Sequence, residues 1–243
     1  MAASYRKGFN LMRSKRFVSI LTILWMVSFV SLAFSGGAFG ASVDSYTFQV
    51  NSSAGNVAFI NESDDQVGLV DSDKKIMVQK VNENDDTEND NINDARYFYD
   101  LIPGETRVPL QHGSGNYEIV LLSHSSGNSY SVVDRINVEV ELENKLLPFL
   151  NSTWPVYWDE DSKATELAAE LVEGITEDSK KIETIYNYIV ENIAYDYDKI
   201  NNIDSFYVPD IDVVLESKTG ICYDYSVLFA GMLRSVDIPT KLV

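Results

Sequence analysis

The sequence predicts an α+β protein in which a small β-sandwich precedes a helical region. From residue 42 to about residue 146, short runs rich in Val, Ile, Tyr and Phe alternate with turn-forming clusters, as in antiparallel β proteins. After residue 147 the apolar residues recur at intervals of three and four, the period of amphipathic helices. With 45% hydrophobic and 12% aromatic residues in 243 positions, the chain can bury a substantial core.

Residues 1–40 have the layout of a secretory signal peptide. Five basic and no acidic residues lead into an uncharged stretch at 17–34, and the small residues SGGAFGAS follow, so cleavage is expected after Gly40 or Ala41. Because the 18 uncharged residues are also enough to cross a bilayer, an uncleaved N-terminal membrane anchor is the alternative. In both cases the basic flank predicts that the rest of the chain is exported, secreted or bound to the cell envelope.

The charge of the chain excludes two classes of partner. There are 37 acidic against 19 basic residues, a net charge of −18. Such a surface repels nucleic acid and anionic lipid headgroups. Contact with a membrane is therefore expected only through residues 17–34, if they remain uncleaved.

The β-sandwich is expected over residues 42–146, as an accessory domain without an enzyme-like group of residues. An Asp- and Asn-rich run at 82–94 reads as a solvated loop, because it lacks the ligand spacing and turn glycine of a calcium loop. No metal site is predicted. Turns are expected at clusters that include 71–75, and strands at 46–50, 56–60, 67–70, 75–81, 117–122, 130–133 and 136–142.

A packed connector is expected at 144–158, and the remainder, 147–243, continues into helices. Helices are predicted at 162–173, at 178–194 and from Gly220 onward, with a loop at 195–212 and the start of a strand at 240–243. The second helix carries an apolar stripe that we expect to pack in the core. Its members are Ile182, Ile185, Tyr186, Ile189, Val190 and Ile193.

Cys222 is the only cysteine, and it lies at the predicted start of the third helix, on the side expected to be buried. An unpaired exported thiol is linked to another chain, buried and inert, or reactive. Backbone N–H groups at a helix N-terminus lower a thiol pKa and can also stabilise an oxyanion, which favours a nucleophile. A small core residue is the competing interpretation.

The residues around Cys222 resemble the transglutaminase-like superfamily, a papain-like group of cysteine enzymes. Its motif G-x-C-x-D-Y-[AS] matches Gly220, Cys222, Asp224, Tyr225 and Ser226, and the runs IETIYNYIVENIAYDYD and LRSVDIPTKLV are similar to the flanking segments. The resemblance implies a papain-like core, of which this chain would hold the helical N-terminal part. It also implies a Cys-His-Asp triad with Cys222 as nucleophile, structural roles for Gly220, Asp224 and Tyr225, and no metal or organic cofactor. The run YVPDID fits secreted members from Gram-positive bacteria.

The chain departs from this pattern because the family histidine and aspartate follow the cysteine by tens of residues, whereas the sequence stops at Val243. His112 and His124 lie in turn contexts and are not expected to substitute. We therefore expect a C-terminally truncated, inactive fragment. Its parent would perform cysteine-dependent acyl transfer or hydrolysis on amides of an extracellular protein or cell-wall peptide. The alternatives are a non-catalytic extracellular or cell-envelope binding module and, more weakly supported, an adhesion domain.

Overall fold

The computed structural model describes residues 46–61, 71–81, 96–102, 104–204 and 207–243. The signal or anchor predicted at 1–40, the strand predicted at 67–70 and the acidic run at 82–94 lie outside this part. Among the described residues, no helix is both long enough and apolar enough to cross a membrane.

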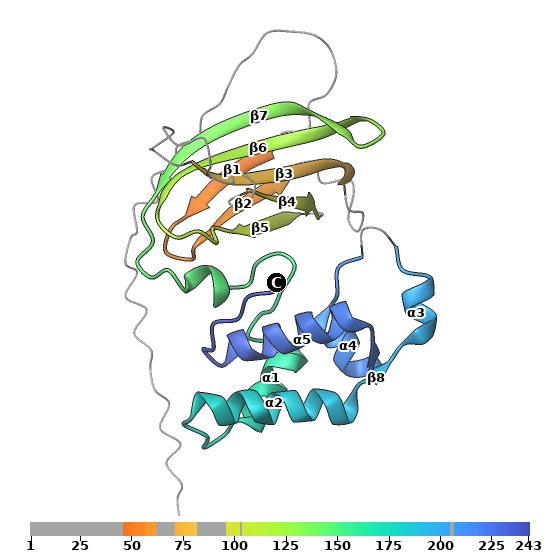
Figure 1. The fold of residues 1–243 in the computed structure, drawn as a ribbon. Coiled ribbons are helices and arrows are strands. Elements are labelled where there is room, and N and C mark those ends of the chain that lie inside the picture. Colours follow the sequence, from red (N-terminus) through yellow and green to blue (C-terminus); the bar gives the residue numbers. More distant parts are fainter. Residues whose placement is uncertain (1–45, 62–70, 82–95, 103, 205–206) are drawn as a thin grey trace, which may run out of the picture. The chain divides into compact units, whose positions relative to one another are not determined.

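The first described region forms two antiparallel sheets (Figure 1). One has the strand order β1-β2-β5 and the other β4-β3-β6-β7. The strands are β1 (Tyr46–Asn51), β2 (Asn56–Asn61), β3 (Asp71–Val81), β4 (Arg96–Leu101), β5 (Glu105–Pro109), β6 (Gly115–Ser126) and β7 (Ser129–Val140).

The two sheets share one hydrophobic cluster, as the layers of a β-sandwich do. In the first sheet Val57 is paired with Val108, and in the second Val78 is paired with Ile119. All four side chains belong to the same buried cluster. Because alternate residues of a strand point to the same face, alternate side chains such as Tyr117, Ile119 and Leu121 of β6 enter this core.

Three details of the predicted β-pattern were wrong. Strands β4 and β5 were not predicted. Pro103 and Gly104 lie between them in the sequence, and both residue types indicate a turn. Residues 71–75, expected to form a turn, belong to β3, whose register with β4 shifts between Asp71 and Lys75. The two strands predicted near the end of the sandwich form the single strand β7, which pairs along β6.

The connector predicted at 144–158 packs as the sequence predicts. It contains a short 3-10 helix, η2 (Leu147–Phe149), and the backbone N–H of Trp154 donates to the carbonyl of Arg107 at 2.7 Å. The Trp154 ring meets Tyr99 edge-on at 5.7 Å and packs against the cluster shared by the sheets.

The second region consists of helices around its own hydrophobic cluster, which extends from Val156 to Ile238. The α5 helix contacts α1, α2 and α4. Together with the sheets, these helices confirm the α+β class (Figure 1). The helices are α1 (Lys163–Leu171), α2 (Asp178–Asn192), α3 (Tyr197–Asn201), α4 (Ile211–Ser217) and α5 (Cys222–Ser235).

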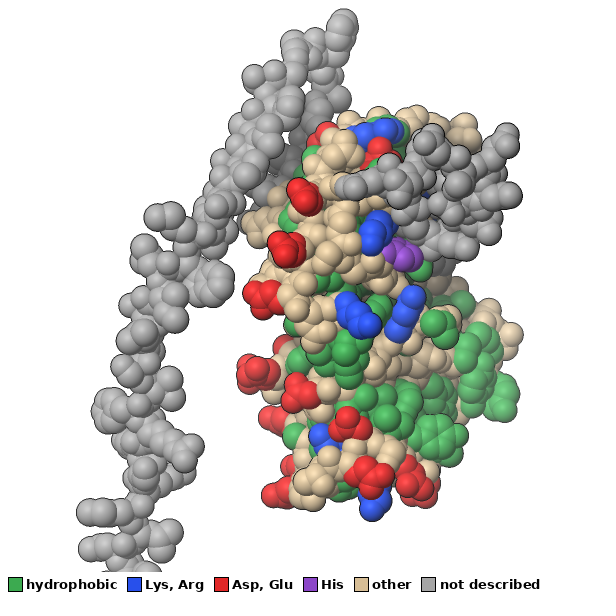
Figure 2. Space-filling model, turned by 60° about the vertical axis from the view of Figure 1, so that its left-hand side comes forward, with side chains coloured by type: hydrophobic (Ala, Val, Ile, Leu, Met, Phe, Trp, Pro, Cys, Tyr) green, Lys and Arg blue, Asp and Glu red, His purple; other side chains and the backbone are tan. Residues whose placement is uncertain are grey.

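Only half of the predicted stripe of α2 packs in the core. Ile185, Ile189 and Ile193 are buried. The other three, Ile182, Tyr186 and Val190, are 38%, 54% and 55% exposed. Figure 2 shows one face of the molecule on which hydrophobic and acidic side chains both reach the surface. The expected full burial was wrong, because the helices packed against α2 bury one edge of this two-residue-wide stripe and leave the other partly open to solvent.

The segment 195–212, expected to be a loop, contains α3 and leads into α4. Asp196 and Asp210 begin these helices, and each carboxylate accepts two backbone N–H groups of the first turn, as N-cap residues do. The short strands β8 (Ala194–Tyr195) and β9 (Thr219–Gly220) pair in parallel across this segment.

The C-terminal end of α5 is held by a buried arginine. The Arg234 guanidinium is 5% exposed. It donates to the carbonyl of Thr240 at 3.0 and 2.8 Å, to the carbonyl of Asn151 at 2.9 Å and to the Thr153 hydroxyl at 3.1 Å. Burial lowers the pKa of Arg234 to about 10, because a desolvated cation is less stable.

The strand predicted at 240–243 does not form in this structure. A strand needs a neighbour for its backbone groups. Here the Thr240 N–H donates instead to the carbonyl of Phe149 at 2.9 Å, in the connector.

Candidate active site

Cys222 is the first residue of α5, and its side chain is exposed. The expectation that it faces the core was therefore wrong. The buried face of α5 contains Asp224, Val227, Leu228 and Gly231, which lie at helical spacing and so share one side. Because this face includes the charged Asp224, a prediction based on apolar residues alone did not identify it as the buried face.

Gly220 brings the chain close to α5 just before the cysteine. A Cβ atom at this position would lie 2.7 Å from the Cβ of Asp224, which is closer than two carbon atoms can pack. The Gly220 carbonyl accepts the Asp196 N–H at 2.9 Å. Because Gly220 has no side chain, the backbone directly before α5 can pack against the first turn of α5.

Asp224 is fully buried, and its carboxylate joins three parts of the chain. One oxygen, Oδ2, accepts the backbone N–H of Ile221 at 2.8 Å and the Lys199 ammonium at 2.7 Å. The other, Oδ1, accepts the Tyr207 hydroxyl at 2.5 Å. The first of these contacts caps α5, because it satisfies the N–H of the residue directly before Cys222.

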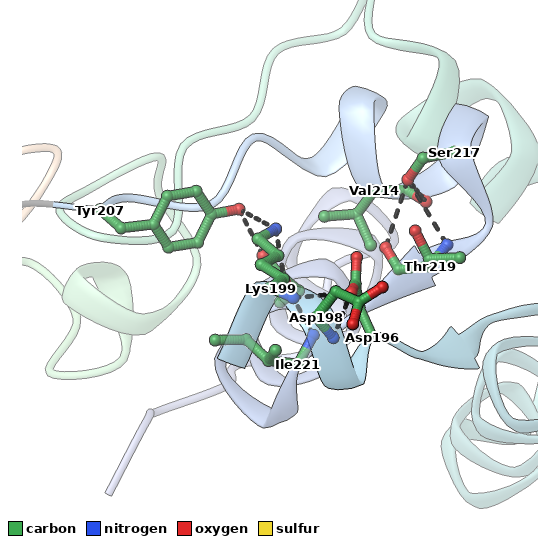
Figure 3. Close-up of polar contacts among 9 residues, drawn as sticks. Asp196, Asp198, Lys199, Tyr207, Val214, Ser217, Thr219 and Ile221 are labelled. Carbon is green, nitrogen blue, oxygen red and sulfur yellow. Dashed lines mark hydrogen bonds and ion pairs between the residues drawn. The ribbon is translucent and has the colours of Figure 1, made fainter. Parts of the chain in front are cut away.

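Lys199 and Tyr207 also contact each other. The Lys199 ammonium donates to the Tyr207 hydroxyl at 2.6 Å and lies 4.3 Å from the centre of its ring. Figure 3 shows the two side chains directed toward one another, close to Ile221. Asp196 starts the helix that carries Lys199 by accepting its backbone N–H at 2.8 Å.

This arrangement keeps Lys199 positively charged beside Asp224. Partial burial acts to lower the pKa of Lys199, but its hydrogen bonds to Asp224 and Tyr207, together with the charge of Asp224, raise the pKa overall. Burial and the hydrogen bond to Asp224 raise the pKa of Tyr207, so the phenol remains a neutral donor. A buried carboxylate is thus matched by one cation and two further donors, as buried charges require.

Tyr225 connects α5 to the end of α2. Its hydroxyl donates to the carbonyl of Ile193 at 2.6 Å, and its ring stacks with that of Tyr195 at a centroid separation of 6.4 Å. The start of α5 is therefore tied on one side through Asp224 and on the other through Tyr225.

The histidines make their contacts within the sheets. His124 hydrogen-bonds through Nε2 to the carbonyl of Gly127 at 2.8 Å, and the His112 ring lies 5.3 Å from that of Tyr97. Neither histidine of the chain forms a hydrogen bond with Cys222 in the described structure. Within the same residues, no group of three or more His, Cys, Asp or Glu side chains could hold a metal ion.

The sequence did not allow Lys199 and Tyr207 to be predicted as site residues. Both lie in the segment 195–212, where aromatic anchors in a loop were expected. The contacts to Asp224 span 25 and 17 positions, and no local pattern encodes a contact at such separations. The only available signal was the aspartate of the motif, a charged residue in a row of core positions.

Comparison with protein families identifies the helical region. The model of the transglutaminase-like superfamily matches residues 165–243, from the first turn of α1 through α5. This part of the chain is similar to the transglutaminase-like superfamily. The matched region, which we call the transglutaminase-like domain, contains Cys222, Asp224, Lys199 and Tyr207. Asp159 to Ala164 lie directly before the match.

A search of curated proteins found no match to this chain. Among solved structures, one from Parabacteroides distasonis, named only provisionally as a protease, is similar at 18% sequence identity with a TM-score of 0.29. The match covers 51% of this chain and 26% of that chain. At this level of similarity the identification depends on the family model alone.

Proposed function

We propose that the protein is a transglutaminase-like cysteine enzyme, or part of one, that acts on amides of proteins or peptides through Cys222. The observation that carries the proposal is the placement of this thiol. Cys222 is exposed at the first residue of α5, within residues that match the superfamily model.

The chemistry follows from the helix start. The Cys222 thiolate would attack the carbonyl carbon of an amide, and the C–N bond would break after a proton reaches the leaving amine. The resulting thioester would then react with water, which gives hydrolysis, or with an amine, which gives transfer. Backbone N–H groups at a helix N-terminus have no acceptor within the helix, so they are available to stabilise the developing oxyanion.

A thiol that works this way needs a base, and we propose that a longer parent protein supplies the histidine and aspartate after Val243. The contacts of the two histidines support this, because His124 is bonded within the β6–β7 turn and His112 packs on Tyr97. By this proposal the 243-residue chain is an inactive fragment. Reading the coding frame beyond the codon for Val243 tests it directly.

We further propose that the protein is exported and that its substrate is an extracellular protein or a cell-wall peptide. The order of basic, apolar and small residues in 1–40 supports this proposal. The intact mass of the mature protein distinguishes cleavage after Gly40 or Ala41 from a retained anchor.

The activity test uses the parent protein with a glutamine-containing peptide and a labelled primary amine. We expect mass spectrometry to detect amine incorporation, deamidation or peptide cleavage in the wild type, and none of these with Cys222→Ala. Turnover that is unchanged by Cys222→Ala would overturn the assignment of the nucleophile.

A non-catalytic envelope-binding module is the second candidate. It is favoured by the lack, within the described residues, of a hydrogen bond between Cys222 and either histidine. Under this alternative, Cys222 in the complete protein should react with iodoacetamide no faster than the thiol of a small cysteine derivative at the same pH.

A further inference from the structure

The carboxylate closest in sequence to Cys222 is buried and paired with a cation from a different helix. Asp224 belongs to the same helical turn as Cys222 and has no exposed surface. A negative charge at this place opposes ionisation of the thiol, since like charges disfavour each other. The ammonium of Lys199, 2.7 Å from Oδ2, has the opposite effect.

We propose that Lys199 and Tyr207 are positioning residues that hold Asp224 as the cap of α5 and balance its charge next to the Cys222 thiol. This inference rests on the proposed function, because it concerns the same nucleophile. Neither residue needs to touch the substrate. Both act through Asp224, which in turn holds the N–H of Ile221.

The geometry makes the two contributions separable. Lys199 supplies a full positive charge as well as a hydrogen bond, whereas Tyr207 supplies only a neutral donor to Oδ1. Removing the charge of Lys199 leaves a net negative charge in the first turn of α5. Removing the charge of Asp224 leaves a net positive one, so the two substitutions should change the ionisation of Cys222 in opposite directions.

Other ionisable groups around the start of α5 come from α5 itself and from several other parts of the chain. They are Tyr223 and Tyr225 on α5, Tyr195 on β8, Asp196 before α3, Tyr197 and Asp198 on α3, and Asp100 on β4, whose charge acts on Tyr223. Burial raises the pKa of Tyr223 to about 12, and burial also raises the pKa of Tyr225. Tyr223 and Tyr225 therefore keep their protons to a higher pH than an ordinary phenol. Asp224 and Lys199 are the charges that the variants change nearest to the capped N–H.

The test uses the full chain, in which Cys222 is the only thiol. The rate of alkylation by iodoacetamide is measured from pH 5 to pH 10, with Cys222→Ser as the blank, and the midpoint gives the pKa of the thiol. We expect Asp224→Asn to lower this midpoint and Lys199→Met to raise it, each by about half a pH unit or more. Lys199→Arg should keep the wild-type midpoint, and Tyr207→Phe should change it less than Lys199→Met.

The matched control is Lys163→Met. Lys163 also pairs with a carboxylate of another helix, Glu216 of α4, but it does not contact Asp224 or Ile221. It should leave the midpoint unchanged. Midpoints that shift in the same direction for Lys199→Met and Asp224→Asn, or that do not shift in folded protein, would overturn the proposal.

If Lys199→Met does not fold because Asp224 is left unpaired, a second comparison replaces it. Lys199→Met is then introduced together with Asp224→Asn, which removes both charges, and circular dichroism confirms the fold. The double variant should have a higher midpoint than Asp224→Asn alone, and equal midpoints would contradict the proposal. A parent protein that shows no Cys222-dependent turnover refutes the proposed function, whereas the opposite shifts are measured independently of turnover.

Discussion

The two hydrophobic clusters differ in the kind of polar group they bury. Among the described residues of the sheets, the buried polar side chains are the neutral Asn56 and Thr106, and the buried Tyr99 and Tyr117 add phenols. Among the described residues of the helical region, two charged side chains are buried, Asp224 and Arg234, and both belong to α5. A neutral group needs one partner, whereas a buried charge needs several. The stability of the transglutaminase-like domain should therefore depend more strongly on single polar contacts.

The largest expected effect is the loss of Arg234. Arg234→Met leaves the partly buried carbonyls of Thr240 and Asn151 and the buried hydroxyl of Thr153 without this donor, and an unsatisfied buried group costs about 1–3 kcal/mol. We expect the free energy of unfolding of the helical region to fall by about 3 kcal/mol, measured by urea titration of the full chain. A loss below about 1 kcal/mol would show that water replaces the guanidinium and that the contrast between the regions is weak.

The next effect concerns Gly220, just before Cys222. Gly220→Ala places a Cβ against that of Asp224, where the space is only 2.7 Å. Overpacking of this kind costs about 1–3 kcal/mol. Thermal unfolding should detect the loss, and alkylation of Cys222 should show a changed pH midpoint because the cap of α5 is displaced. Unchanged values for both would mean that β9 shifts freely.

In the sheets, a neutral buried phenol should produce a pH effect. Burial raises the pKa of Tyr117 to about 12, above its ordinary value of about 10. The folded state therefore holds its proton more tightly, so this stabilisation is fully present below about pH 10 and is lost as the pH rises toward about 12. Urea titrations at several alkaline pH values should show stability falling across this window.

Tyr117→Phe is the matched variant for that measurement. It removes the hydrogen bond to the Gly113 carbonyl at a cost of about 1 kcal/mol at neutral pH, and it should make the alkaline decline shallower. The decline should not vanish, because burial also raises the pKa of Tyr99. An unchanged slope would exclude Tyr117 as a source of the alkaline decline.

The smallest effect is expected at an exposed ion pair of the sheets. Arg135 donates to Glu118 at 2.8 Å, with its side chain 52% exposed. Surface pairs of this type contribute about 0.2–1 kcal/mol, so Arg135→Met should change the free energy of unfolding by about half a kcal/mol or less. It also serves as the control for Arg234→Met, and a comparable loss at both arginines would remove the distinction between buried and exposed charge.

The sequence predicts the fold class and the start of α5, because period and turn chemistry are local properties. The family motif likewise identifies Cys222 and Asp224 without a structure. The pairing of Asp224 with Lys199 and Tyr207 could not be predicted, since it depends on how the segment after α2 returns to the start of α5. The side of α5 on which Cys222 lies was misjudged for a related reason. Asp224 is polar in sequence, yet it occupies a core position once its charge is matched.

The parallel pair β8–β9 has a consequence for local motion. The N–H of Ala194 donates to Lys218 and that of Asp196 to Gly220, at 2.8 and 2.9 Å, so two hydrogen bonds close the chain between these strands into a loop. The entropy cost of closing a loop rises only slowly with its length, so these two bonds at its base matter more than the number of residues inside. In hydrogen exchange, the amides of Ala194 and Asp196 should therefore open together, and that opening should uncouple α3 from α5 without unfolding the domain.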